Sequence, residues 1–226
     1  MKRFALLIAL GLAAMPAWGQ ETLRQLTVTG EGSVAAVPDM AMVSLGVVHQ
    51  DRDAALAMAR SSDATAAMLK RLTDLGIEPR DVQTSQVSLS PVYSGRESTG
   101  EPRIEGFRAS LMLNLRVRDL DRLGAILGAV LADGANRFSG LQFGLIEPQP
   151  VEDAARKAAV ADAMRKAVLY ADAAGVKLGR VVSIHENGGG GVMPKMMAAS
   201  ERMADVPIAE GELNLAQSVT IVLELD

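Results

Sequence analysis

Cysteine is absent from this sequence, and aromatic residues are scarce: the 226 residues include one tryptophan, two tyrosines and four phenylalanines. Without cysteine the chain forms no disulfide bonds, so its stability must come from a hydrophobic core. The shortage of aromatic side chains leaves little surface on which sugars or nucleotide bases stack. The formal net charge is −4, and this acidic balance argues against a protein that binds nucleic acid.

Residues typical of catalytic or metal centres are also few. The chain has two histidines, His49 and His185, whereas a zinc site usually takes three or four ligands from histidine, cysteine and carboxylates. Neither a Gly-x-Ser-x-Gly motif nor a phosphate-binding glycine loop with its lysine occurs. Gly30-Glu31-Gly32 lacks the third glycine of a dinucleotide site and is interpreted as a turn. We therefore expect a protein without enzymatic activity, catalytic residues or cofactor.

The N-terminus has the layout of a cleavable secretory signal. A positively charged start precedes an apolar run over residues 4–14, and the small residues Ala17 and Gly19 follow. The run of about eleven residues is too short to cross a membrane, which takes roughly 20. We therefore expect residues 1–19 to be removed. Residues 20–226 should then form a periplasmic domain without a transmembrane span, either free or associated with the outer membrane.

Along the rest of the sequence, apolar residues recur at the spacing typical of strands in some segments and at that of helices in others. Alternation of apolar and polar residues predicts half-buried strands, the clearest at 26–30, 41–48, 105–118 and 213–225. Helical spacing predicts helices at about 51–75, 120–133 and 151–174. The third helix is expected to turn small residues inward: Ala154, Ala158, Ala161, Met164, Ala167, Ala171 and Ala174. This order predicts an α+β fold, a largely antiparallel sheet packed with three helices, as one unit or as two related halves.

One long stretch, residues 187–210, has no regular period. Asn187 is followed by four glycines and then by a segment rich in methionine, and we expect a flexible loop that forms no regular element. Its methionines are the candidate metal ligands: Met193, Met196, Met197 and Met203. Thioethers select Cu(I) and also take up oxidant reversibly. The alternative is that they pack against the sheet or a partner chain as adaptable apolar groups.

Several segments together resemble the SIMPL-domain family of exported bacterial proteins. The alanine-dense helix and glycine stop at 154–180 are similar to that family, as are the strand at 26–32, the segment 134–143 and the entry to the last strand at 207–213. The resemblance implies a periplasmic or envelope protein linked to oxidative-stress tolerance and, in relatives from pathogens, to immune recognition. It supplies no catalytic residue.

Two hypotheses about function follow. The first is a non-enzymatic envelope protein that forms a homo-oligomer or binds another envelope component. It is favoured by apolar residues on the expected outer face of the sheet: Met40, Met42, Val48 and Met112. The second is a stress protein that binds copper or scavenges oxidant through its methionine loop.

Overall fold

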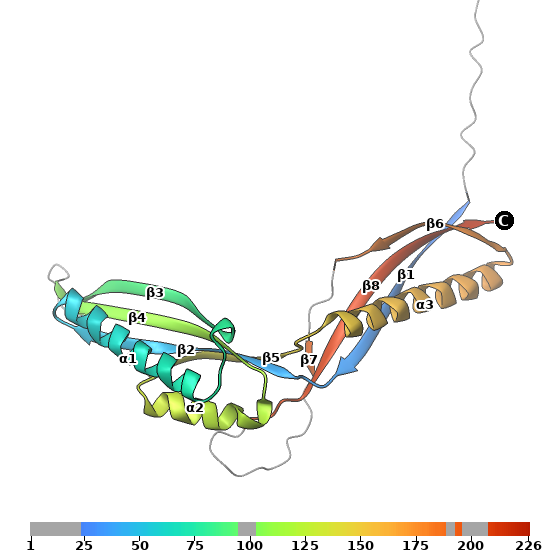
Figure 1. Cartoon of the computed structure of the whole chain (residues 1–226). Helices are drawn as coiled ribbons and strands as arrows, with labels where there is room; N and C mark the ends of the chain where they lie inside the picture. The colour runs from blue at the N-terminus through green and yellow to red at the C-terminus, as the bar shows by residue number, and fades with distance from the viewer. Residues whose placement is uncertain (1–23, 95–102, 189–192, 196–207) are drawn as a thin grey trace, which may run out of the picture.

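The computed structural model describes residues 24–94, 103–188, 193–195 and 208–226. These form two lobes arranged as a V, each a single antiparallel sheet with helices on one face (Figure 1). The predicted α+β class, with largely antiparallel strands and three helices, is therefore confirmed. No helix among these residues is both long enough and apolar enough to cross a membrane.

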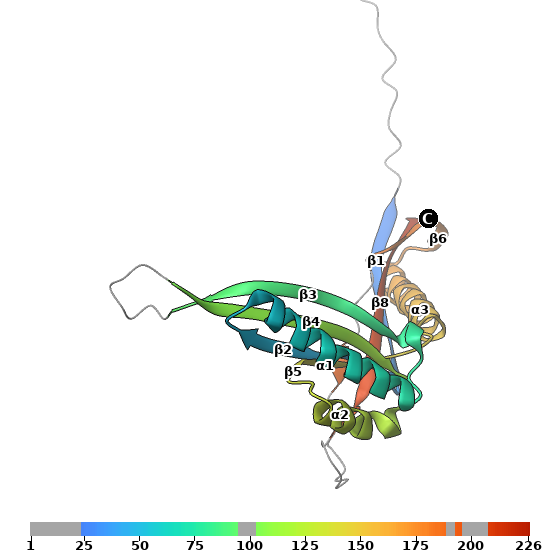
Figure 2. The same ribbon diagram turned by 60° about the vertical axis from the view of Figure 1, so that its left-hand side comes forward.

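The central lobe is one continuous piece of the chain, residues 40–144. Its strands follow the order β3-β4-β2-β5, and Figure 2 shows α1 and α2 on the same side of the sheet. Its elements are β2 (Met40–Asp51), α1 (Ala54–Asp74), β3 (Val82–Tyr93), β4 (Ile104–Val117), α2 (Leu123–Ala132) and β5 (Arg137–Gly144). α2 buries Leu123, Ile126, Leu127 and Val130 in the core of this lobe.

The terminal lobe combines the two ends of the described chain. Its elements are β1 (Gln25–Ala36), α3 (Gln149–Ala174), β6 (Leu178–Glu186), β7 (Met193–Lys195) and β8 (Glu212–Leu225). β8 lies in the middle of this sheet, with β1 along one edge and both β6 and β7 along the other. The expectation that 187–210 holds no regular element is wrong at β7, because backbone pairing with β8 makes Met193–Lys195 a short strand.

The lobes meet where two crossing segments lie side by side. Residues 37–39 connect β1 to β2, and residues 145–148 connect β5 to α3. The Asp39 amide donates to the Gly144 carbonyl at 3.1 Å, and the Asp39 carboxylate accepts from the Ile146 amide at 2.6 Å. This pair of hydrogen bonds ties both crossings together at the base of the V (Figure 1).

In the terminal lobe, α3 lies directly against the backbone of β1. Ala155, Ala159 and Ala163 are fully buried and face Gly30 and Gly32 of β1. A Cβ atom on Gly30 would lie 2.1 Å from the Ala159 carbonyl oxygen, and on Gly32 it would lie 2.2 Å from that of Ala155. The two glycines therefore serve close packing inside a strand of 12 residues, and their interpretation as a turn is wrong.

The expected inward face of α3 is also wrong in part. The buried residues repeat every four positions: Ala155, Ala159, Ala163, Ala167 and Ala171. Ala154, Ala161 and Ala174 are exposed, and Ala158 and Met164 are half-buried. Alanine is so common in this helix that several faces carry it, and only contact with the two glycines of β1 selects one.

Gln217 is the polar interruption on the helix-facing side of β8. It is buried, and its side-chain oxygen Oε1 has no hydrogen-bond partner among the described residues. Because an unpaired buried carbonyl loses its hydration without compensation, Gln217→Met is expected to raise the free energy of unfolding by about 1 kcal/mol. Urea denaturation measures the change, and a Gln217→Met protein less stable than the wild type would contradict it.

Candidate functional site

The two histidines lie in different lobes. His49 in β2 is half-buried, and its Nδ1 atom lies 3.4 Å from the Ser61 hydroxyl oxygen of α1. Ser61 is fully buried and donates to the Ala109 carbonyl at 3.3 Å. A hydroxyl without access to solvent does not meet a substrate, so this serine–histidine contact attaches α1 to the sheet. His185 in β6 is exposed.

The methionine site falls mostly beyond what the structure describes. Met193 lies in β7 and pairs through its backbone with Asn214, while Met196, Met197 and Met203 are outside the described residues. The copper and oxidant hypothesis therefore stays a prediction. Within the described ranges, histidine and carboxylate side chains form no group of three suited to a metal ion.

A buried ion pair joins the start of β3 to the end of β4. Asp81, in the 3₁₀ helix Pro79–Asp81, is buried and accepts from the Arg118 Nε and Nη2 atoms, both at 2.8 Å. Arg116 approaches the same carboxylate at 3.7 Å. The hydrogen bonds from Arg118 lower the pKa of Asp81 below its ordinary value, although burial acts in the opposite direction. Because the Asp81 side chain is 4% exposed and its partners are two arginines of the β4 end, this arrangement attaches the start of β3 to the end of β4.

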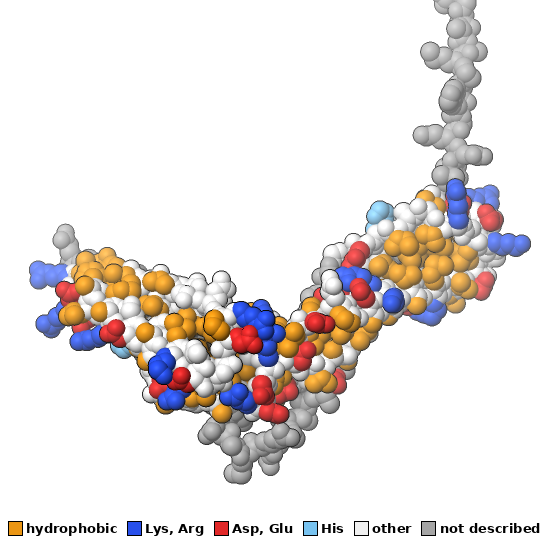
Figure 3. Space-filling view, in the orientation of Figure 1, with side chains coloured by type: hydrophobic (Ala, Val, Ile, Leu, Met, Phe, Trp, Pro, Cys, Tyr) orange, Lys and Arg blue, Asp and Glu red, His pale blue; other side chains and the backbone are white. Residues whose placement is uncertain are grey.

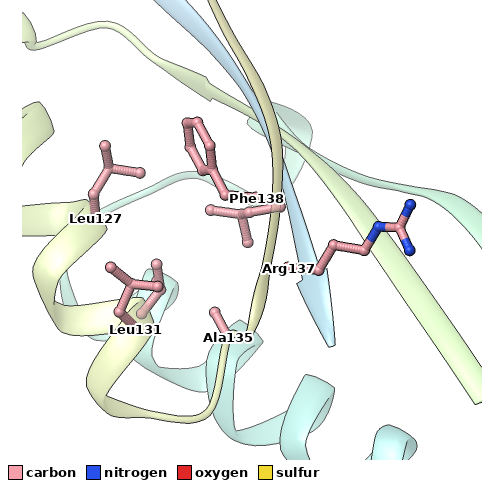
Figure 4. Close-up of a pocket in the computed structure, with 7 residues that line it drawn as sticks. Leu127, Leu131, Ala135, Arg137 and Phe138 are labelled. Atoms are coloured by element: carbon pink, nitrogen blue, oxygen red, sulfur yellow. The ribbon is translucent and has the colours of Figure 1, made fainter. Parts of the chain in front are cut away.

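An apolar cavity of about 200 Å³ opens between α2 and β5. Leu127, Leu131 and Phe138 point into it in Figure 4, whereas the Arg137 guanidinium points away. Its other lining residues are Leu45, Val130 and Ala135. A cavity without polar groups has nothing to orient a substrate, so it accommodates apolar atoms but carries no chemistry of its own.

The terminal lobe exposes a group of large apolar side chains beside α3. In Figure 3 they form an orange area over the part of the lobe where α3 and β6 lie. The exposed members are Val168, Val181 and Ile184. Val181 and Ile184 pair with Leu223 and Ile221 of the helix-side core, so they face the same side as α3. Val168 follows Val160 and Met164 at four-residue spacing on α3, and those two residues pack against the same core. We call Val168, Val181 and Ile184 the terminal-lobe apolar surface.

The apolar face expected from the sequence is less exposed than the terminal-lobe apolar surface. Met112 is buried, with its sulfur over Gly46, while Met40 and Val48 are half-buried. Met42 alone of the four is exposed, at 42%. The prediction of an exposed apolar face on β2 and β4 is therefore correct only at Met42. The larger apolar surface lies on elements whose sequence pattern did not indicate it.

The geometry is that of a two-lobed α+β protein in which an alanine-rich helix packs on a glycine-containing strand. The chain belongs to the SIMPL family, whose model, described as "Protein of unknown function (DUF541)", matches residues 26–223. This confirms the family resemblance that the sequence segments indicated.

Relatives cover most of the chain. The 26 kDa periplasmic immunogenic protein of Brucella melitensis is 37% identical over 238 residues, which cover 98% of this chain and 95% of that protein. Uncharacterized protein YggE of Escherichia coli K12 is 29% identical over 185 residues, covering 81% and 74%. The protein of the same name from Edwardsiella ictaluri is 31% identical over 156 residues, covering 69% and 65%.

Proposed function

We propose that this chain is a non-enzymatic protein of the periplasm that acts by binding copies of itself. The observation that carries the proposal is the terminal-lobe apolar surface, because exposed apolar side chains gathered in one place usually mark an interface. Its members, Val168, Val181 and Ile184, are 48%, 42% and 55% exposed in the single chain. Burial of each such side chain stabilises an association by about 1–2 kcal/mol.

The periplasmic location is supported by two independent features. The N-terminal residues have the pattern of a secretory signal, and the Brucella melitensis relative is named as periplasmic. An envelope protein other than this chain is the alternative partner, and a link to oxidative-stress tolerance remains what the family resemblance implies.

Light scattering of the protein lacking residues 1–19, at micromolar concentration, tests the proposal. We expect a mass that is a multiple of one chain. The substitutions Val168→Lys and Ile184→Lys should reduce that mass, because a lysine ammonium group resists removal from water. Both positions are exposed, so the fold of one chain should tolerate the changes.

Leu56→Lys is the matched control. Leu56 is 51% exposed, close to the 55% of Ile184, but it lies on α1 in the central lobe, so this variant should keep the wild-type mass. A wild-type protein with the mass of one chain would refute the proposal. An equal loss of mass in all three variants would show that the terminal-lobe apolar surface has no special role.

A further inference from the structure

Each sheet has two edge strands, and an edge strand exposes backbone N–H and C=O groups that lack a partner strand. The edges are β3 and β5 in the central lobe, and β1 and β6 with β7 in the terminal lobe. Soluble proteins usually protect such edges with charge, irregular pairing or a covering element, since an open edge pairs readily with another chain. The edges of this protein differ sharply in that respect.

The edge of β1 is closed by side chains of α3. The Asp162 carboxylate accepts from the Glu31 amide at 3.1 Å, and the Lys166 ammonium donates to the Thr29 carbonyl at 2.9 Å. Hydrogen bonds from Lys166, Arg165 and the Glu31 amide hold the pKa of Asp162 well below its usual range. The carboxylate is therefore charged and occupies the position that a partner strand would take.

The edges of β5 and β6 are protected by irregularity. β5 has 8 residues, and its pairing with β2 shifts register between Ser44 and Leu45. β6 has 9 residues, shifts register twice against β8, and carries charges at Arg180 and Glu186. Short, interrupted or charged strands make poor templates for a further strand.

Among the described residues, β3 has such protection only near its two ends. Its pairing with β4 shifts register between Thr84 and Gln86, and Pro91 has no backbone N–H to donate to a further strand. The strand is 12 residues long, nine of them exposed, and it contains no aspartate, glutamate, lysine or arginine. Its pairing with β4 runs without a register shift from Gln86 to Val92. Within this stretch Val87 is 60% and Leu89 is 43% exposed. Gln86 to Ser90 is therefore a regular, uncharged stretch of edge with exposed apolar residues, the arrangement that accepts another strand.

We propose that β3 pairs antiparallel with β3 of a second copy of this chain, with Ser88 opposite Ser88 on the two-fold axis. In this register Val87 lies opposite Leu89 of the second copy, and Gln86 lies opposite Ser90. Val87 and Leu89 both face the helix side, because their partners Leu111 and Ala109 in β4 do. The pairing therefore places apolar residues against apolar ones and polar residues against polar ones on each face.

The absence of charge in β3 favours the second copy as the occupant. A two-fold axis brings identical segments together, so a charged strand would place like charges opposite one another at a cost in stability. An uncharged strand meets its own copy without that penalty. The pairing rests on the proposed self-association and adds to it a second interface, which is distinct from the terminal-lobe apolar surface.

Because the chain has no cysteine, one introduced thiol reports the register directly. Ser88→Cys is expected to give a disulfide-linked dimer on mild oxidation, since opposite residues of an antiparallel pair lie about 4.5–5.5 Å apart between Cα atoms, within the range that a disulfide spans. Ser33→Cys in β1 is the matched control: it is also a serine on an edge strand and is exposed. It should give little dimer on a non-reducing gel.

Val87→Lys and Leu89→Lys supply the second measurement by light scattering. Both should lower the mass of the assembly without unfolding the chain, because both positions are exposed. If the wild type is oligomeric but Ser88→Cys forms no dimer and Val87→Lys keeps the full mass, β3 pairing is refuted while self-association stands. If the wild type has the mass of one chain, both proposals are refuted. A Ser88→Cys cross-link in envelope extract to a chain of another mass, without a homodimer, would assign the edge to a different protein and refute this pairing.

Discussion

Replacing Gly30 by alanine is expected to lower the free energy of unfolding by about 3 kcal/mol or more, because overpacking against backbone leaves little room for relaxation. The new Cβ atom would lie 2.1 Å from the Ala159 carbonyl oxygen and 2.4 Å from the Ala163 amide nitrogen. Neither neighbour is the end of a flexible side chain, so the whole helix α3 must move away from the sheet. That movement exposes the core formed around Val28 and Ile221.

Gly140→Ala is the control for this substitution. Gly140 lies in β5, and a Cβ atom there would have no neighbour within 4 Å, so its free energy of unfolding should change by less than about 1 kcal/mol. Urea denaturation followed by circular dichroism compares the two variants. Equal stability of Gly30→Ala and Gly140→Ala would show that α3 does not press on β1 as closely as described.

The second large effect is expected at the buried ion pair. Asp81→Asn should lower the free energy of unfolding at neutral pH by about 2–3 kcal/mol, less than for a wholly buried pair because Arg118 retains contact with water. The Arg118 side chain is 35% exposed, whereas that of Asp81 is 4% exposed. Asp74→Asn is the control: Asp74 pairs with Lys70 on the surface of α1, and its loss should cost less than about 0.5 kcal/mol.

The same pair predicts the direction of a pH effect. The pKa of Asp81 is lowered in the folded state by hydrogen bonds from Arg118, whereas in the unfolded chain it lies near the ordinary value of about 4. The stabilisation is therefore complete above that value and is lost as the pH falls through the folded-state pKa. Urea denaturation at pH 7 and pH 3 should show a smaller difference between Asp81→Asn and wild type at pH 3. A constant difference would contradict this linkage.

The type and order of elements were accessible from the sequence because each depends on local patterns. The alternation in 105–118 predicted the extent of β4 and one of its buried faces, since Ala109, Leu111 and Leu113 are all buried. It did not predict that Ser110 and Met112 on the other face are buried as well. Helix α3 ends at Ala174 because Gly175 adopts a left-handed φ of 67°. Neither inference required knowledge of distant parts of the chain.

The arrangement in space was not accessible in the same way. Gly30 and Gly32 have the composition of a turn, and only the approach of α3, more than 120 residues later in the sequence, explains why glycine stands inside a strand. The inward face of α3 was mispredicted for the same reason. When most candidates are alanine, hydrophobicity does not distinguish one face from another, and the shape of the neighbouring strand decides.

The candidate site was even less predictable. Apolar residues of β6 such as Val181 and Ile184 have the pattern of an ordinary buried strand, and their exposure follows from the position of α3 over β1 and β8. β3 contains no motif, and its open edge follows only from its position at the end of the strand order. One signal was present in the sequence: residues 82–93 are free of charge, which is unusual for a strand at an edge.

The sequence of the central lobe is inserted between the two parts of the terminal lobe, and this affects the order in which the lobes fold. β1 is made first, but its partner is β8, where Gln25 pairs with Glu224. The central lobe is complete once residue 144 has emerged, whereas β1 must wait for almost the entire chain. Contacts so distant in sequence form slowly, and an unpaired strand is prone to aggregate until they do. The N-terminal strand therefore stays unpaired until almost the whole chain is available, and a holding chaperone that acts in this interval would raise the yield of folded protein.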